Sequence, residues 1–513
     1  MGREFQIRAP QTLETLGAAI AVWVFYLVCL AVYRLYLSPL ARFPGPKLAA
    51  LSRWYEAYYD IILGGQYYRN VDKLHDMYGP IVRIAPDELH IRDSQFYEQF
   101  YGQNQKLDKP GWDAKFGVKE SGFTTPGHAL HRERRGALRR MFSRRMILSF
   151  EPVIRERAER LCEKFLDYAE TSQPLVIPDA YPCYTGDIML QFAFGLRYKQ
   201  IESANFEKSF HKAFKTMGAS GHVIAQFPWI APLMDALPDT LLERIQPALE
   251  HMLQMKRDVR SLIERTVRGE DFADKSVTHP TIFQEILQSD IRPQEKSQQR
   301  LFDEAQIVVG AGIETTAYAL TVATFHIVNN PRIYQKLREE LVQAIPDINA
   351  PPTLLELEKL PYLTGCIMEC LRLSYGLTGR NPRSRDQPLK YGDWVIPAKT
   401  IVTMCIADVH HDESIFPDSR SFIPERWLDD PLAPDGTPLD RYLVSFGRGL
   451  RSCLGINLAW AELYTVLGLV FRRMDFKLYK TDISDVEMEH DNFVPHVRVE
   501  SEGVRVLVSK VSA

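Results

Sequence analysis

An uncharged apolar segment near the N-terminus, Thr15–Tyr33, stands out from the rest of the hydrophobic pattern. At the rise of an α-helix this segment spans about 28 Å, which matches the hydrocarbon core of a bilayer. Positive charges follow it at Arg34 and Arg42, and no small-residue cleavage site of a signal peptide follows. We therefore expect residues 1–36 to form a membrane anchor, with a transmembrane helix at about 15–33 and the body of the chain in the cytosol.

A short proline-rich segment, Phe43-Pro44-Gly45-Pro46, separates this anchor from the body. Proline fixes its own φ angle, so residues 37–50 are expected to form a stiff hinge. Beyond it, the apolar positions recur mainly at the period of an α-helix, most clearly over Phe283–Glu340. Breaks in that helical pattern are expected near Pro293 and Pro331.

Runs with the composition of β-strands are short and widely spaced along the chain. They are Ile81–Ala85, Leu89–Ile91, Leu389–Ile396, Ile401–Ile406, Val497–Val499 and Val504–Val508, the last two separated by a turn at Gly503. The pattern therefore predicts a mostly α fold with small β-sheets (α+β). No internal stretch has the composition of a linker, so residues 51–513 are expected to form one large domain.

The composition narrows the class of protein. The chain has 513 residues and a net charge of −3, so nothing in its overall charge indicates a nucleic-acid partner. Its seven cysteines are scattered and include no C-x-x-C pair. That distribution argues against a disulfide framework or a thiolate zinc site, and it favours a reducing compartment.

One of these cysteines, Cys453, lies in a glycine-flanked loop just before a predicted helix, Ile456–Arg472. A cysteine at a helix N-terminus is near the positive end of the helix dipole, which favours the thiolate over the thiol. A buried thiolate that faces a flat site is a suitable axial ligand for haem iron. A buried structural cysteine is the better interpretation of a lone Cys, but the surrounding pattern F-x-x-G-x-R-x-C-x-G makes a chance match improbable.

A second segment, Val308–Thr316, lies inside the long apolar helix pattern and contains Gly310 and Gly312 next to Glu314 and Thr315. Glycine in a helix interior costs about 1 kcal/mol relative to alanine, so the helix is expected to weaken and bend here. The resulting groove would let Thr315 orient a water molecule and let Glu314 relay protons from solvent. The alternative is a kink filled by packing, with Glu314 solvated.

Together these two segments resemble the cytochrome P-450 family, the haem-thiolate monooxygenases. The resemblance implies a cytochrome P-450 fold in which haem b lies between the long distal helix and the loop that carries Cys453. By the same resemblance Cys453 is the axial iron ligand, Phe446 shields its sulfur, and Gly449 lets the backbone approach the ring. The residues implied for contacts with the haem propionates are Arg451, His131, Arg135 and Arg383.

Two further segments match elements of the same family. Glu369 and Arg372 form an E-x-x-R pair on one helix face, and Arg426 lies in the segment P-E-R-W. The resemblance implies that these three charged groups form a buried network that fixes the Cys453 loop, because buried charges must be paired. Two turns depart from the family pattern, with Lys399 where glycine is usual and Arg420 where proline is usual.

The resemblance implies a monooxygenase that takes electrons from NADPH through a separate NADPH-cytochrome reductase, because the chain has no flavin or dinucleotide motif. It also implies a single-pass anchor in the endoplasmic reticulum membrane. The arginine-rich run between residues 132 and 145 is interpreted as the docking face for that reductase, not for nucleic acid.

The substrate is expected to be a lipophilic small molecule, with a pocket lined by Lys106–Thr125 and Ser209–Leu237. Phe43–Tyr101 resembles fungal members of the family such as trichodiene-oxygenase-like enzymes, which implies a terpenoid or polyketide-type secondary metabolite. One alternative is a haem-thiolate isomerase or dehydratase without external electrons, although such relatives often lose the threonine that is retained here at Thr315. The other is a non-catalytic membrane haem binder, in which a proton relay would have no purpose.

Overall fold

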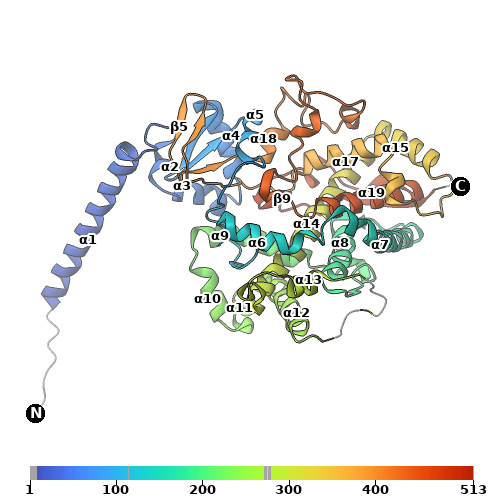
Figure 1. The fold of residues 1–513 in the computed structure, drawn as a ribbon, viewed down its shortest axis with the longest axis horizontal. Helices are drawn as coiled ribbons and strands as arrows, with labels where there is room; N and C mark the ends of the chain where they lie inside the picture. Colours follow the sequence, from blue (N-terminus) through green and yellow to red (C-terminus); the bar gives the residue numbers. More distant parts are fainter. Residues whose placement is uncertain (1–8, 114, 271–273, 275–278, 512–513) are drawn as a thin grey trace, which may run out of the picture.

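A single apolar helix projects from a large helical body in the computed structural model, which describes residues 9–113, 115–270, 274 and 279–511 (Figure 1). This helix, α1 (Ala9–Val32), continues into η1 (Tyr33–Leu37). Residues Glu14–Leu37 are long and apolar enough to cross a membrane, and their most apolar stretch is not buried in the body. Near the end of this range, the Arg34 guanidinium donates to the carbonyl oxygen of Leu51. The predicted N-terminal helix is therefore present, and it begins six residues earlier than expected.

Long helices form the core of the body. They are α4 (Tyr67–Tyr78), α6 (His128–Arg139), α7 (Arg144–Thr171), α8 (Ile177–Phe194), α9 (His211–Gln226), α12 (Glu250–Val267), α14 (Gln298–Asn329), α15 (Pro331–Ala344), α17 (Pro361–Ser374) and α19 (Ile456–Arg473). The central helix α14 packs along α8, and α7 packs along α19. These contacts bury a continuous set of aliphatic and aromatic side chains, so α14 lies at the centre of one core.

Shorter helices connect the long ones and cover the edges of the body. They are α2 (Lys47–Leu51), α3 (Trp54–Ala57), α5 (Ser94–Tyr101), α10 (Ile230–Ala236), α11 (Asp239–Ile245), α13 (Ile282–Gln288), α16 (Leu354–Leu357) and α18 (Ile406–His410). The break between α13 and α14 contains Pro293, and α15 starts at Pro331. Both helix breaks predicted from proline are therefore confirmed.

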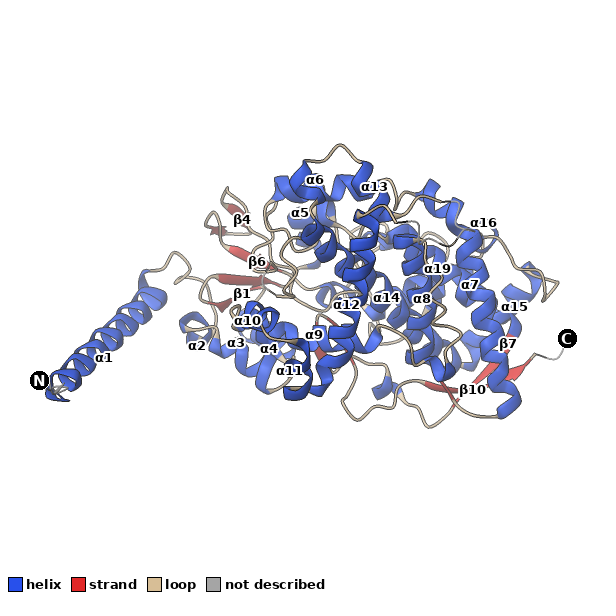
Figure 2. Ribbon diagram, turned by 90° about the horizontal axis from the view of Figure 1, so that it is seen from below, coloured by secondary structure: helices blue, strands red, loops and turns tan. Residues whose placement is uncertain are grey.

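Two small sheets and two hairpins complete the fold. In the first sheet β1 (Ile81–Ala85) pairs with β2 (Glu88–Ile91), which pairs in parallel with β6 (Ile401–Thr403). The second has the order β3 (Leu175–Val176), β10 (Arg505–Lys510), β7 (Met474–Leu478). The hairpins are β4 (Leu389–Tyr391) with β5 (Trp394–Ile396), and β8 (His490–Asn492) with β9 (Val494–His496). Figure 2 shows β1, β4 and β6 at the end of the body near α1, and β7 and β10 at the opposite end.

The predicted strand at Val497–Val499 is wrong. The strand in this region is β9, which ends at His496, and the side chain of Val499 is 82% exposed. A strand needs a partner for its backbone and a face to bury, and this run has neither in the described structure. The valines of this run, without a pairing partner, are therefore not enough to predict a strand. Lys399, at a position where glycine was expected, has a left-handed φ of 62°.

The proline-rich segment docks against β1. The amide of Arg83 donates to the carbonyl oxygen of Pro44 over 2.7 Å, and the Arg83 guanidinium donates to the carbonyl oxygen of Arg34 over 2.7 Å. A Cβ at Gly45 would lie 2.4 Å from the Arg83 carbonyl oxygen, so only glycine permits this approach. These contacts fix the end of the N-terminal helix against the body.

Candidate functional site

A cavity of about 320 Å³ lies between α14 and the loop that carries Cys453. Ala311 and Thr315 line it from α14, and Phe446 and Cys453 line it from the opposite side. The two segments that sequence analysis singled out therefore face each other across one space. The remaining lining is mostly apolar and includes Phe116, Phe123, Phe214, Met217, Ile307 and Phe493.

The Cys453 loop is a tight turn closed by its own backbone. The amide of Cys453 donates to the carbonyl oxygen of Phe446 over 2.7 Å, and α19 begins three residues later at Ile456. Gly449 has a φ of +71°, and a Cβ there would lie 1.9 Å from the carbonyl oxygen of Tyr101. Gly449 therefore lets the loop pack closely against the end of α5, and its expected approach to the haem ring stays a prediction.

The sulfur of Cys453 is open to the cavity, although the residue lies deep in the protein. Burial raises the pKa of the Cys453 thiol, and the backbone N–H of Gly455 and the charge of Arg135 offset only part of that rise. The helix terminus therefore does not produce a thiolate by its electrostatics alone. A bound metal ion deprotonates a coordinating thiol outright, and such an ion would supply the missing stabilisation.

Four cationic side chains, Lys109, Arg135, Arg383 and Arg451, line the cavity near the Cys453 loop. Burial lowers the pKa of each of them, and for Arg451 burial and the charge of Arg383 lower it to about 9. Their hydrogen bonds run only to backbone carbonyl oxygens, at Phe123, Ser452, Pro382, Leu107, Thr125 and Pro126. No carboxylate of the described residues forms an ion pair with any of the four. These buried cations therefore lack a counter-charge, which an anionic group in the cavity would supply.

Two residues in this cationic cluster differ from the sequence prediction. Burial, followed by the charges of Arg451 and Arg135, lowers the pKa of His131 to about 2, so its ring is neutral and offers an N–H in place of a charge. Lys109 was not predicted as a charged contact. Its ammonium lies 3.8 Å from the ring centre of Trp112 and 3.5 Å from that of Phe123, contacts that no sequence spacing could indicate.

The segment around Gly310 and Gly312 lies within one unbroken helix. Helix α14 is continuous from Gln298 to Asn329. A Cβ at Gly310 would lie 2.3 Å from the Phe214 ring, and a Cβ at Gly312 would lie 2.3 Å from Met189. The glycines therefore let α9 and α8 pack closely on α14, and the expected bend stays a prediction. The hydroxyl of Thr315 donates to the carbonyl oxygen of Ala311 over 2.8 Å, as expected for threonine in a helix.

Glu314 is not solvated, because it pairs with a histidine that sequence analysis missed. The Nδ1 atom of His211, at the start of α9, lies 2.9 Å from one carboxylate oxygen of Glu314 and 3.1 Å from the other. Burial acts to lower the pKa of His211, but the charge of Glu314 outweighs it and the pKa is raised. His211 is 23% exposed, so this ion pair connects the cavity wall to the protein surface.

The predicted charge network is present behind the Cys453 loop. Glu369 and Arg372 are completely buried and form two parallel hydrogen bonds of 2.9 and 2.8 Å. The carboxylate of Glu369 also accepts from Arg426 over 3.0 Å and from the indole N–H of Trp427 over 2.8 Å. Charges in a dry interior persist only with this number of partners, so the network is a rigid structural unit.

A histidine connects this network to the loop. The Nδ1 atom of His410 bonds the carbonyl oxygen of Arg372 over 2.7 Å, and the amide of Val444 donates to His410 Nε2 over 2.9 Å. The carbonyl oxygen of Val444 in turn accepts from the amide of Gly447, inside the loop. The position of Cys453 is thus tied to the buried ion pair through backbone and imidazole contacts. Trp427 and His410 were not predicted, because both act through contacts distant in sequence.

A family model described as Cytochrome P450 matches residues 54–498 of this chain. The chain belongs to the cytochrome P450 family. The cytochrome P450 monooxygenase sdnE of Sordaria araneosa is 42% identical over 97% of this chain and 98% of its own length. The cytochrome P450 monooxygenase tpcC of Cochliobolus heterostrophus is 41% identical, with 96% and 97% covered. The tryptophan 6-hydroxylase fscE of Fusarium equiseti is 39% identical, with 96% and 97% covered.

Membership of the cytochrome P450 family makes this chain an oxygen-incorporating oxidoreductase and implies haem with a cysteine ligand. The residues present fit that group. Cys453 offers its sulfur to the cavity, and the four unpaired cations Lys109, Arg135, Arg383 and Arg451 lie where anionic propionates would neutralise them. The mostly helical fold with small sheets agrees with the same family.

Replacement of Glu369 by Gln is expected to destabilise the protein by about 3–5 kcal/mol, because it leaves the buried guanidinium of Arg372 without a counter-charge. The midpoint of chemical unfolding measures this loss. As a matched control, Glu489 forms an exposed pair with Arg69 at 2.8 Å, and Glu489→Gln should change stability by less than about 1 kcal/mol. Equal effects of the two substitutions would contradict the structural role of the buried pair.

Proposed function

We propose that this protein is a membrane-anchored monooxygenase that takes electrons from NADPH through a separate reductase and inserts one oxygen atom into a lipophilic fungal secondary metabolite. The observation that supports it most directly is the single cavity with the sulfur of Cys453 on one wall and Thr315 on the other. The haem, ligated by Cys453 and neutralised by Lys109, Arg135, Arg383 and Arg451, would supply the redox chemistry that activates dioxygen.

In this proposal, residues of α14 deliver protons to the cavity and hold a water there. The hydroxyl hydrogen of Thr315 is directed to the Ala311 carbonyl oxygen, so the lone pairs of its oxygen are free to accept a hydrogen bond from a water in the cavity. Glu314 and His211 form the only ion pair between the described parts of α9 and α14, and His211 reaches the surface. A proton therefore has a route from solvent to His211, to Glu314 and to a water held by Thr315.

The apolar walls of the cavity exclude bulk water and suit a lipophilic substrate. Phe116, Phe123 and Phe493 form an aromatic cluster with Trp112, with ring centres 4.8–6.1 Å apart. We propose a terpenoid or polyketide-type substrate. The same walls would equally suit an aromatic ring. Two relatives are named for hydroxylation of tryptophan or N-acetyltryptophan.

The N-terminal region supports membrane attachment. The proposal divides the chain into an anchor at 1–36, a hinge at 37–50 and a catalytic domain at 51–513. Large apolar side chains are exposed on α3 and the helical turn after it, at the residue before α10, and on α10 and α11. They are Trp54, Tyr58, Ile62, Trp229, Leu233 and Ile245. Figure 1 shows α10 on the same side of the body as α1, so this face would contact the lipid surface. We propose the endoplasmic reticulum membrane, with the catalytic domain in the cytosol.

An exposed basic face supports docking of an acidic reductase. Its members on and after α6 are Arg132, Arg139, Arg140, Arg144 and Arg145. Arg134, from the same run, is instead buried and bonded to Glu295 over 2.6 Å, so it takes no part in docking. The face borders the Cys453 loop through Arg135, which donates to the Ser452 carbonyl oxygen. Electrons delivered here would enter close to the cysteine sulfur.

Thr315→Ala is expected to uncouple the reaction. In membranes that contain the full chain and an NADPH-cytochrome reductase, the variant should still consume NADPH but form product about tenfold more slowly or less, because the water held by Thr315 is lost. The measurement is product formed per NADPH consumed. An unchanged ratio would contradict the role of Thr315, and turnover without NADPH or reductase would favour an isomerase instead.

His211→Gln is expected to change the pH dependence of that ratio. Because Glu314 raises the pKa of His211, the charged pair is present below that raised pKa and is lost as pH rises through it. Wild-type coupling should therefore fall on the alkaline side, and the variant should be poorly coupled at neutral pH and lack that alkaline fall. His251→Gln, an exposed histidine on α12, serves as the control. A His211→Gln profile that matches wild type would remove this residue from the relay.

A further inference from the structure

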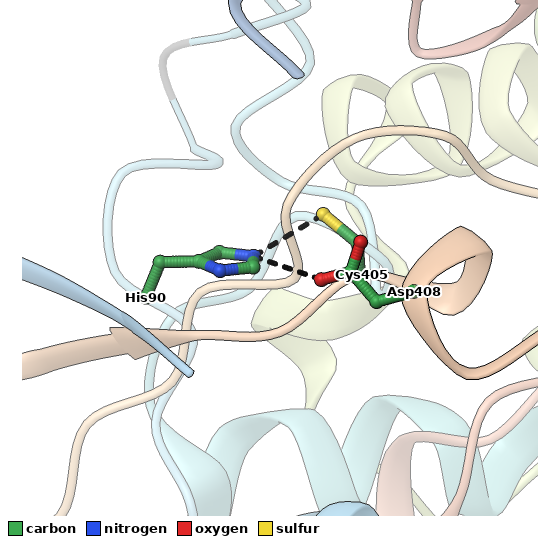
Figure 3. Close-up of side chains that lie close together, drawn as sticks. All are labelled: His90, Cys405 and Asp408. Atoms are coloured by element: carbon green, nitrogen blue, oxygen red, sulfur yellow. Dashed lines mark hydrogen bonds and ion pairs between the residues drawn. The ribbon is translucent and has the colours of Figure 1, made fainter. Parts of the chain in front are cut away.

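A second group of potential metal ligands lies outside the cavity, where β2 meets the start of α18. The Nε2 atom of His90 lies 3.3 Å from the sulfur of Cys405 and 3.8 Å from Oδ2 of Asp408 (Figure 3). All three ligand atoms lie within 4.8 Å of one another. Parallel pairing of β2 with β6 sets His90 opposite Thr403, two residues before Cys405, and so brings these distant residues together.

The hydrogen-bond pattern of His90 directs a lone pair at this group. His75 Nδ1 contacts the carbonyl oxygen of Gly79 over 2.8 Å, and a carbonyl only accepts, so this nitrogen carries the hydrogen. With its hydrogen on Nδ1, the neutral ring of the buried His75 accepts at Nε2. The partner at 2.7 Å is His90 Nδ1, which must then be the donor. The Nε2 atom of His90 is left without a hydrogen, and it faces Cys405 and Asp408.

The neighbouring groups are all electron-rich. Oδ2 of Asp408 is sealed from solvent and has no hydrogen-bond partner. The carboxyl group of Asp72 lies beside that of Asp408. Two guanidinium groups that act on this region have other partners. That of Arg92 bonds Asp76 over 2.6 Å and the carbonyl oxygen of Asp72, and that of Arg380 pairs with Glu56 and Glu88. An imidazole lone pair, a sulfur and the Asp408 carboxyl group thus converge, with the Asp72 carboxyl group beside that of Asp408. Among the described residues, no lysine or arginine side chain is bonded to either carboxyl group.

We propose that His90, Cys405 and Asp408 bind a divalent transition-metal ion, with Zn²⁺ as the best match and the Asp72 carboxylate or a water as the fourth ligand. Zinc bonds of about 2.0–2.3 Å at tetrahedral angles set ligand atoms about 3.3–3.6 Å apart. The two separations from His90 Nε2, 3.3 Å to Cys405 and 3.8 Å to Asp408, lie within a few tenths of an ångström of that range. Imidazole, thiolate and carboxylate are the donors that zinc prefers, and the hydrogen bond from His90 Nδ1 to His75 would fix the orientation of the His90 ring.

The competing interpretation is that the ligand atoms of this group bind hydrogens and no metal ion. The Cys405 thiol could then donate to His90 Nε2, and the two carboxyl groups could share a hydrogen. That arrangement needs no metal, and in it the removal of one carboxylate charge would relieve repulsion. The two interpretations therefore predict opposite effects for Asp408→Asn.

Bound zinc would act as a structural clamp. The group joins β2 of the first sheet to α18, and α18 carries His410, which holds the Val444 amide before the Cys453 loop. Ile406 of α18 also lines the central cavity. A metal ion here would therefore stabilise the support of the haem site from a distance, independently of the ion at Cys453.

Metal analysis of the full-length protein, purified in detergent without chelators and desalted after addition of excess Zn²⁺, tests this proposal. We expect about one zinc per chain in addition to the haem iron, and less than about a fifth of that in Asp408→Asn and His90→Gln. Cys162→Ala, which removes a buried cysteine on α7 far in sequence from the group, should keep the zinc. Haem content, followed by its absorption, reports separately on the Cys453 site.

Thermal unfolding provides the second measurement. A strong zinc chelator should lower the melting temperature of the wild type by a few degrees, Zn²⁺ but not Mg²⁺ should restore it, and Asp408→Asn should not respond. A wild-type protein that takes up no zinc, or an Asp408→Asn variant that is more stable than wild type whether or not zinc is present, would overturn the proposal in favour of the protonated cluster.

Discussion

The active site depends on a buried ion pair that never touches the cavity. Glu369 and Arg372 are completely buried, and they are tolerated there because each makes several hydrogen bonds. Arg372 holds His410 by its carbonyl oxygen, His410 holds the amide of Val444, and the turn from Val444 leads directly to the Cys453 loop. Rigid support of this kind allows one cysteine sulfur to be presented in a fixed direction.

The buried cations that line the cavity lack a counter-charge unless an anion binds there. Lys109, Arg135, Arg383 and Arg451 repel one another in a dry environment, and burial lowers the pKa of each. A dianionic cofactor in the same space relieves that repulsion and binds only the folded chain, so its binding adds to stability by mass action. Cofactor retention and fold stability are therefore coupled in this protein, and the cationic cluster is the reason.

Features that depend on residues close together in the sequence could be predicted from the sequence. The Cys453 loop, the Glu369–Arg372 pair, the N-terminal helix and the proline breaks around α14 are all properties of neighbouring residues, and each was recognisable. Partners distant in sequence were not. His211 meets Glu314 from another helix, and His90 meets Cys405 from 315 residues away. The packing role of the α14 glycines was missed for the same reason, because their close neighbours Phe214 and Met189 are distant in sequence.

The proposed chemistry requires that the sulfur of Cys453 is the axial ligand of a bound haem. The absorption spectrum of the reduced, carbon-monoxide-bound protein tests it most directly, because the position of the main band reports the axial atom. The account predicts the long-wavelength band of a thiolate ligand in the wild type and a band at the shorter wavelength of a nitrogen ligand in Cys453→His. A wild-type protein that binds no haem, or whose spectrum shows nitrogen ligation, would contradict it.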